Sequence, residues 1–287
     1  MRSACAAVVF FTTLKGTDFM TKDIIGIVGF GHLGTSIAMS LLNRGFPKEC
    51  LMISCRGSKA TLERAEKFGL TGTLSDTKNL MAKADIIILA AKPQDVSTIY
   101  TNKIKDGALV MSFMAALPYD SLKKMFDCEV CRVMCSGPET ITSGNGASVL
   151  WPQNTRADQV LECAGIKRFP ISLEEEIDAF TVGICVPPIL MNITVEKGEV
   201  KSALGAAAKR YPVMDKLTPW IETALGAGES DDNKACLENV CTKGGISEAM
   251  VKSLMSGESF ALSLKRGLER CSQICEEIQK KICKNAA

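Results

Sequence analysis

The stretch IIGIVGFGHLG, residues 24–34, decides the fold of this chain. A short apolar run opens it, glycines in the pattern GxGxxG follow, and residues 33–43 have the composition of a helix. A strand, a tight glycine turn and a helix in this order predict a Rossmann unit, in which the helix start binds the pyrophosphate of a dinucleotide. The predicted cofactor contacts in this loop are Gly29, Phe30, Gly31, His32, Leu33 and Gly34.

Each glycine of the loop has an expected role. Gly29 permits the tight turn, Gly31 lets the backbone approach the pyrophosphate, and Gly34 lets the helix pack against the strand. The helix start then offers amide donors and the positive end of the helix dipole. His32 is the only histidine in the chain, and its place in the loop favours a loop or phosphate contact over acid–base catalysis. A hydrolase built on a histidine is therefore not expected.

The residues at the end of the second apolar run indicate which dinucleotide binds. An NAD-binding unit usually presents an acidic side chain about 20 residues after the glycines, where it holds the ribose 2′-hydroxyl. This chain reads SCRGSK at residues 54–59 and has no acid there. Ser54 and Arg56 suit a 2′-phosphate, because a guanidinium can donate two hydrogen bonds to it. NADP(H) is therefore predicted; the alternative is that Arg56 is a solvated loop cation.

Apolar runs and helical segments alternate through the first half of the chain and then stop alternating. Strands are also predicted over residues 51–55, 85–90, 108–112 and 130–134, with helices over residues 59–68 and 119–125. Beyond about residue 172, helices are predicted near residues 173–196, 199–210, 213–226, 231–239, 246–255 and 258–283. The alternation predicts an α/β Rossmann fold with a doubly wound parallel sheet, followed by an all-α helical dimerisation domain.

Three segments are expected along the chain. They are an N-terminal extension over residues 1–20, an NADP-binding Rossmann domain over 21–171, and a helical substrate and dimerisation domain over 172–287. The first 19 residues are apolar and contain no acid until Asp18, but Arg2 is their only basic flank. No clear small-x-small cleavage site follows. We expect a cytoplasmic protein, and an organelle presequence stays open.

The composition is that of a globular protein, with 46% hydrophobic and 23% charged residues. A net charge of +2, with cations and anions interspersed, gives no basic stripe, so no nucleic-acid partner is expected. No later window has the roughly 18 uncharged apolar residues of a membrane helix, so no membrane partner is expected either. The thirteen cysteines are interpreted as reduced thiols. The spacing of Cys128, Cys131 and Cys135 could suggest zinc, but no second ligand pair follows, and no metal is predicted.

Five further blocks of the sequence resemble the pyrroline-5-carboxylate reductases. AAKPQ at residues 90–94 resembles the AVKPQ of that family, SFMA at 112–115 its SIAAG, and RVMCSGP at 132–138 its RVMPNTP. GAS at 146–148 matches the GxT stretch that follows, and NVCTKGGIS at 239–247 resembles VTSPGGTT. The order and spacing of these blocks make the resemblance specific, and it extends from about Asp23 to Cys271.

The resemblance implies a two-domain reductase whose helical domains interleave in a homodimer or a higher oligomer of dimers. It also implies that NADPH reduces the C=N bond of pyrroline-5-carboxylate, a small imine acid, to give proline. The residues that it places around the cofactor ribose and nicotinamide are Ala91, Lys92, Pro93, Ala115, Ser136 and Pro138. Those that it places around the substrate are Gly244, Gly245, Ile246 and Ser247, with Ser247 as the catalytic residue.

The substrate segment can also be interpreted without the resemblance. Two successive glycines at the start of a predicted helix expose backbone amides at its positive end, which suits a small carboxylate. Ser247, in the first turn, could form a hydrogen bond with the imine nitrogen. Hydride transfer to a protonated imine needs positioning more than a strong base. The alternative for Gly244 and Gly245 is an ordinary turn at a helix start.

Three blocks depart from the pattern of the family. PNTP has become CSGP at residues 135–138, SPGGTT has become TKGGIS at 242–247, and GSGPAY is nearly erased at 183–190, which read GICVPPIL. The cofactor half is thus better preserved than the substrate half. Two alternatives stay open: a related NADP-dependent oxidoreductase with another small imine or carbonyl substrate, and a non-catalytic dinucleotide-binding regulatory paralogue.

Overall fold

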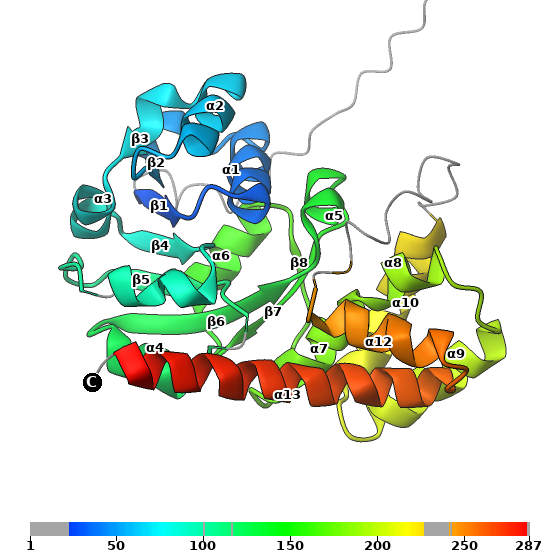
Figure 1. Cartoon of the computed structure of the whole chain (residues 1–287). Helices are drawn as coiled ribbons and strands as arrows, with labels where there is room; N and C mark the ends of the chain where they lie inside the picture. The colour runs from blue at the N-terminus through cyan, green and yellow to red at the C-terminus, as the bar shows by residue number, and fades with distance from the viewer. Residues whose placement is uncertain (1–22, 100, 116, 227–240, 242, 286–287) are drawn as a thin grey trace, which may run out of the picture.

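The computed structural model describes residues 23–99, 101–115, 117–226, 241 and 243–285. The predicted extension over residues 1–20 and the predicted helix over 231–239 lie outside these residues. Within them, residues 25–168 form an eight-stranded sheet with its flanking helices, and helices alone follow, as predicted (Figure 1). No helix in the described ranges is long and apolar enough to span a membrane.

The strands of the sheet lie in the order β3-β2-β1-β4-β5-β6-β7-β8. Their bounds are β1 Ile25–Val28, β2 Leu51–Ser54, β3 Leu74–Ser75, β4 Ile86–Leu89, β5 Leu109–Ser112, β6 Glu129–Cys135, β7 Ala147–Trp151 and β8 Lys167–Arg168. The five strands predicted from apolar runs are confirmed as β1, β2, β4, β5 and β6. Strands β3, β7 and β8 were not predicted.

The predicted parallel sheet is confirmed except at one pair of strands. β7 runs antiparallel to β6, and the other pairs are parallel. The connection from β6 to β7 holds only the short helix α5, Pro138–Thr142. Because this connection does not cross a face of the sheet, the chain returns beside β6 in the opposite direction.

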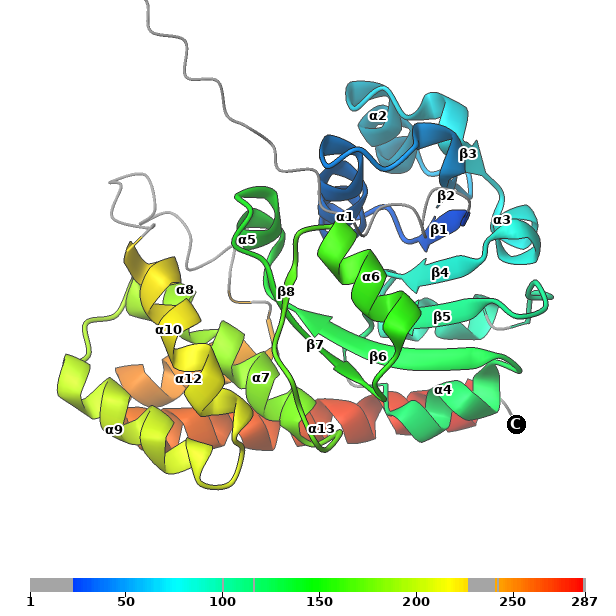
Figure 2. The same ribbon diagram turned by 180° about the vertical axis from the view of Figure 1, so that it is seen from behind.

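Helices cover both faces of the sheet. One face is covered by α1 (His32–Asn43), α2 (Lys59–Lys67) and α6 (Thr155–Cys163) (Figure 2). The opposite face is covered by α3 (Thr77–Lys83), the 3-10 helix η4 (Pro93–Thr98) and α4 (Tyr119–Met125). Two short 3-10 helices, η2 (Lys48–Cys50) and η3 (Thr71–Thr73), precede β2 and β3. Ile86 and Ile88 of β4 pack toward the first set, and Ile87 and Leu89 toward the second. Burial on both faces accounts for the continuous apolar run of this strand.

Six helices are described after residue 172. They are α7 (Glu176–Ile184), α8 (Val186–Leu190), α9 (Lys197–Ala208), α10 (Val213–Gly226), α12 (Ile246–Met255) and α13 (Phe260–Asn285). The single helix predicted over residues 173–196 was wrong, because α7 ends before Pro187 and Pro188 and a second, short helix begins there. Proline cannot donate the amide that would continue the first helix.

The helical region packs on the later strands of the sheet. α7 contacts β6 and β7, and the apolar core of the region includes Ala147 and Val149 of β7. α13 contacts η4 on the sheet half. Its C-terminal end lies near α4 (Figures 1 and 2). Buried Arg132 of β6 forms an ion pair with Glu174, just before α7. The two halves therefore share apolar and charged contacts.

Candidate functional site

The glycine loop after β1 has the geometry that its sequence predicts. Gly29 adopts φ +103°, and a Cβ atom there would collide with the backbone of Ala91. A Cβ at Gly34 would collide with the carbonyl oxygen of Gly29, so α1 can approach the loop only with glycine at this position. A Cβ at Gly31 would meet nothing within 4 Å, which leaves open space beside the backbone. Gly29 and Gly34 hold the turn, and Gly31 leaves room for a ligand.

The N-terminus of α1 is free to bind an anion. Gly31 precedes the helix with an extended backbone, no side chain caps the first turn, and no acidic residue lies in it. His32 is exposed at the helix start, whereas Phe30 is 4% exposed and packs in the core with Leu33 against it. The first amides of a helix have no partner within the helix, so this end of α1 fits a dinucleotide pyrophosphate.

Loops from three parallel strands emerge beside this helix start. Val28 of β1 pairs with Leu89 of β4, which pairs with Ser112 of β5, so the three strands end at one edge. The Ala90 amide also donates a hydrogen bond to the Val28 carbonyl oxygen at 2.8 Å. In an open α/β sheet, ligands bind beyond the carboxyl ends of the strands.

The structure places four of the predicted cofactor residues at this edge. Ala91 and exposed Lys92 follow β4, and Pro93 opens η4. Ala115 is exposed in the turn that follows β5. These residues come from two neighbouring loops, and Ala91 lies directly against Gly29 of the glycine loop. The structure therefore brings them together with the predicted pyrophosphate site.

Ser136 and Pro138 occupy a different environment. The Ser136 side chain is buried, its hydroxyl oxygen accepts a hydrogen bond from the Ala147 amide at 3.0 Å, and it lies 2.6 Å from the Thr140 hydroxyl. It therefore ties the end of β6 to β7 and α5. Pro138 is half-buried at the first position of α5. These contacts give Ser136 a structural task that the sequence did not indicate.

The end of β2 presents the residues predicted to bind a 2′-phosphate. Ser54 Oγ lies 2.6 Å from Thr77 Oγ1, so this hydroxyl is already hydrogen-bonded within the chain. Arg56 is exposed in the following turn, and its guanidinium makes one long hydrogen bond, 3.4 Å, to the Thr98 hydroxyl. Arg56 thus keeps donors available to a phosphate, whereas Ser54 has less freedom.

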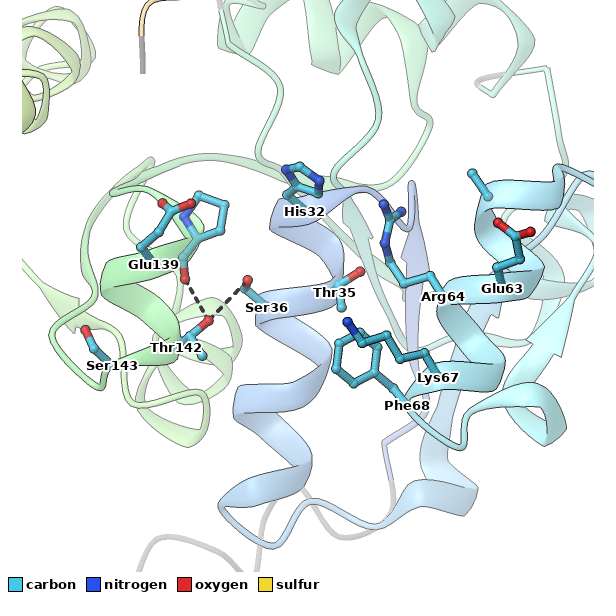
Figure 3. Close-up of a pocket in the computed structure, with 12 residues that line it drawn as sticks. His32, Thr35, Ser36, Glu63, Arg64, Lys67, Phe68, Glu139, Thr142 and Ser143 are labelled. Carbon is cyan, nitrogen blue, oxygen red and sulfur yellow. Dashed lines mark hydrogen bonds between the residues drawn. The ribbon is translucent and has the colours of Figure 1, made fainter. Parts of the chain in front are cut away.

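Another arginine, Arg64, contacts the glycine loop, and it was not predicted from the sequence. Arg64 of α2 donates a hydrogen bond from Nη1 to the Phe30 carbonyl oxygen at 2.6 Å. It lines an open groove of about 840 Å³ between α1, α2 and α5, together with His32 and Thr35 (Figure 3). The two bonded residues are 34 positions apart, and no motif or helical spacing connects them.

The second predicted site, at the start of α12, is partly occupied by the chain itself. Gly244 adopts φ +72°, and its amide donates a hydrogen bond to the Glu248 carboxylate at 2.7 Å. Arg270 of α13 donates from Nε to the Gly244 carbonyl oxygen at 2.8 Å. Hydrogen bonds from Lys252 and Gly244 hold the pKa of Glu248 below its usual range. A carboxylate of the protein therefore lies where a substrate carboxylate was expected, and Glu248 was missed.

Ser247 lies against the segment in which the resemblance is nearly erased. It is half-buried in the first turn of α12, as is Ile246, and it forms a hydrogen bond with the thiol of Cys185, which follows α7. Burial raises the pKa of Cys185 to about 11, although the bond from Ser247 opposes this shift. Gly245 caps the helix with an extended backbone and without a side-chain hydrogen bond. Figure 1 shows α12 beginning on the side of the helical region that faces the sheet.

The cysteine cluster considered for zinc does not form a binding site. Cys131 and Cys135 lie in the core on one face of the sheet, where burial raises the pKa of each thiol to about 12. Cys128 packs on the opposite face. Within the described ranges, no three His, Cys, Asp or Glu side chains are placed to hold a metal ion.

Comparisons with known proteins identify relatives of this chain. Residues 24–116 match the family described as NADP oxidoreductase coenzyme F420-dependent. The chain is 27% identical to the pyrroline-5-carboxylate reductase of Aquifex aeolicus over 55% of its own length and 60% of that enzyme. It is 21% identical to the pyrroline-5-carboxylate reductase of Haemophilus influenzae over 91% of its own length and 99% of that enzyme.

Solved structures show the same fold. A pyrroline-5-carboxylate reductase from Coxiella burnetii aligns with a TM-score of 0.57 at 20% identity, covering 89% of this chain and 98% of that one. The pyrroline carboxylate reductase of Plasmodium falciparum, solved with NADP bound, aligns with a TM-score of 0.55 at 21% identity, covering 91% and 99%. The resemblance to the pyrroline-5-carboxylate reductases stated from the motifs is confirmed, at 20–27% identity.

Proposed function

We propose that this protein is an NADP(H)-dependent reductase of the C=N bond in a small cyclic imine, as in the reduction of pyrroline-5-carboxylate to proline. The observation that carries the proposal is the uncapped N-terminus of α1 behind Gly31, where a Cβ atom would meet only open space. The match of residues 24–116 to an NADP oxidoreductase family supports the same cofactor. So do the absence of an acid at residues 54–59 and the exposed Arg56.

Each part of the site would have a separate task in this reaction. The amides at the start of α1 bind the pyrophosphate, and the loops that carry Ala91, Lys92 and Ala115 border the nicotinamide half of the cofactor. NADPH, when bound there, would supply the hydride for the imine carbon, and with a proton from solvent on the nitrogen the products would be the amine and NADP⁺. The Ser247 hydroxyl oxygen accepts a hydrogen bond from the protonated nitrogen. Such positioning lowers the barrier without a strong acid or base.

One observation favours a second candidate substrate. In a reductase of imine acids, the amides of Gly244 and Gly245 would hold the substrate carboxylate. The Gly244 amide is instead hydrogen-bonded to Glu248, 2.7 Å away. A second carboxylate at the same helix start would be repelled. A related reductase acting on an imine or carbonyl without a carboxylate is therefore the second candidate.

The test of the proposal is NADPH oxidation by the purified full-length chain. Pyrroline-5-carboxylate and the unsubstituted cyclic imine 1-pyrroline would be compared at equal concentration, with a reaction lacking imine as control. Oxidation that depends on either imine would support the proposal. Binding of NADPH without oxidation by either imine would contradict imine reduction and would favour a regulatory dinucleotide-binding protein.

A further inference from the structure

Arg64 contacts the glycine loop from a helix that the dinucleotide fingerprint does not include. α2 is fixed against the sheet by Ala65, which is fully buried. Its neighbour Arg64 is half-buried, and its Nη1 donates to the Phe30 carbonyl oxygen at 2.6 Å. A hydrogen bond from a charged donor is stronger than one between neutral groups. The Phe30 carbonyl is therefore held in one direction, toward α2.

The direction of this carbonyl determines the direction of the next amide. A trans peptide is planar, and its carbonyl oxygen and its amide hydrogen point to opposite sides. Because the Phe30 oxygen points to Arg64, the Gly31 amide points away from α2. No acceptor for that amide is found in the ranges that the structure describes. It lies beside the start of α1, next to the space that the missing Cβ of Gly31 leaves open.

The loop needs such a fixed contact because glycines surround this peptide. Gly29 and Gly31 flank Phe30, and glycine restricts backbone rotation less than any other residue. The Phe30 ring is anchored in the core at 4% exposure. The ring fixes the side chain and Arg64 fixes the carbonyl, so the peptide between Phe30 and Gly31 is held at both ends.

We propose that Arg64 is a positioning residue for cofactor binding, which orients the Gly31 amide toward the pyrophosphate through the Phe30 carbonyl. The inference rests on the proposed function only in taking a nicotinamide dinucleotide as the ligand. The pyrophosphate is common to NADPH and NADH, so Arg64 supports both equally. Arg56, in the turn after β2, is the residue expected to bind the 2′-phosphate, which NADH lacks. The two arginines therefore have separable effects on affinity and on preference.

Lys67 provides a matched control for the charge of Arg64. It lies three residues further along α2 and lines the same groove (Figure 3), but it is exposed and makes no hydrogen bond to the loop. Arg64→Ala and Lys67→Ala each remove one positive charge from the same helix. Only the first removes the bond to Phe30. Arg64→Lys keeps the charge and one donor, and it should restore part of the lost affinity.

The experiment is a titration of NADPH and of NADH onto the full-length wild type and four variants: Arg64→Ala, Arg64→Lys, Lys67→Ala and Arg56→Ala. Arg64→Ala should weaken both cofactors roughly tenfold and leave the ratio of their Kd values unchanged. Lys67→Ala should leave both Kd values near those of the wild type. Arg56→Ala should weaken NADPH alone. Thermal unfolding of each apo variant would separate a binding defect from a folding defect, and partial rescue in Arg64→Lys would support the positioning role.

Several outcomes would overturn the inference. They are unchanged Kd values in Arg64→Ala, an equal loss in Lys67→Ala, or a loss confined to NADPH. A wild type that binds neither dinucleotide would overturn both this inference and the proposed cofactor. A wild type that binds both dinucleotides but reduces no imine would contradict the proposed reaction alone, and the Kd ratios would still decide the role of Arg64.

Discussion

The Glu248 carboxylate accepts a hydrogen bond from the Gly244 amide, at 2.7 Å, at the start of α12. This contact places a negative charge at the helix end that would otherwise attract an anion. Replacing Glu248 with Gln should therefore lower the KM for pyrroline-5-carboxylate about threefold and leave the KM for uncharged 1-pyrroline unchanged. Steady-state kinetics with both imines would measure this. Glu269→Gln, on an exposed part of α13, is the control, and an equal change for both imines would contradict the charge argument.

Ser247 is the residue on which the proposed chemistry depends most directly. Ser247→Ala should lower turnover of a cyclic imine roughly ten- to a hundredfold, because a lost hydrogen bond to a charged group costs about 1.5 to 3 kcal/mol. NADPH binding should be unchanged, since the serine belongs to α12 and the predicted pyrophosphate site to α1. Turnover and cofactor affinity would be measured together. Ser256→Ala, at the other end of α12, is the control; full activity in Ser247→Ala would place the substrate elsewhere.

Much of the sheet could be predicted because its signals are local. The continuous apolar runs of β1, β4 and β5 follow from burial on both faces, and each depends only on neighbouring residues. β3 and β8 have two residues each, too few to show a period. The direction of β7 depends on whether the chain crosses a face of the sheet after β6, and no pattern of residues in the sequence indicates whether it does.

The residues of the candidate site divide in the same way, into those whose contacts are local in the sequence and those whose contacts depend on packing between elements. The expected roles of Gly29 and Gly34 were confirmed, because the turn and the close approach of α1 act between near neighbours. Glu248 could have been found, since an acid at the third position of a helix commonly bonds back to an amide before it. Arg64 could not, because its partner lies on another element and only the packing of α2 brings them together.

Asp85 should make stability depend on pH in the acid range. Burial raises the pKa of this carboxyl, but hydrogen bonds from Lys105 and the Ile24 amide outweigh that effect, so the pKa is lowered overall. Ionised Asp85 therefore stabilises the fold above the unfolded pKa of about 3.9, and this stabilisation is lost as pH falls through the lower folded pKa. Asp85→Asn should be less stable than the wild type at neutral pH, and the gap should close in acid. Denaturant unfolding at several pH values would test this, with exposed Asp106→Asn as control; a gap that does not change with pH would contradict it.

A homodimer formed by the helical half is expected. The resemblance to the pyrroline-5-carboxylate reductases implies it, and Met255, at the end of α12, is the most exposed large apolar side chain in the described ranges, at 76%. Sedimentation at micromolar concentration should give about twice the mass of the chain, and Met255→Glu should shift the protein toward monomer. Leu62→Glu, which changes a 45% exposed leucine in the sheet half, is the control. A wild type that sediments as a clean monomer would contradict the expected assembly.

The ion pair between Arg132 and Glu174 should contribute strongly to the attachment of the helical region. Arg132 lies on β6 with 6% of its surface exposed, and Glu174 also accepts a hydrogen bond from the Tyr119 amide at 2.8 Å. Removing one partner of a fully buried pair costs about 3 to 5 kcal/mol. Glu174 keeps 28% of its side chain exposed and its hydrogen bond from Tyr119, so Arg132→Met should lower the free energy of unfolding by less, about 1 to 3 kcal/mol.

Arg266→Met is the control for this prediction, because it removes the same kind of side chain from an exposed pair with Glu258 on the surface of the helical region. Exposed ion pairs contribute little to stability, so this variant should unfold nearly as the wild type does. Denaturant unfolding would be followed by helix content and by tryptophan fluorescence, in a Trp151→Phe background so that the signal comes from Trp220. The Trp220 indole donates a hydrogen bond to the Asn145 carbonyl oxygen at 2.8 Å across the two halves. If Arg132 joins the halves, the Trp220 signal should change at lower denaturant concentration in Arg132→Met than in the wild type. Equal stability of the two arginine variants would show that the buried pair contributes no more than an exposed one.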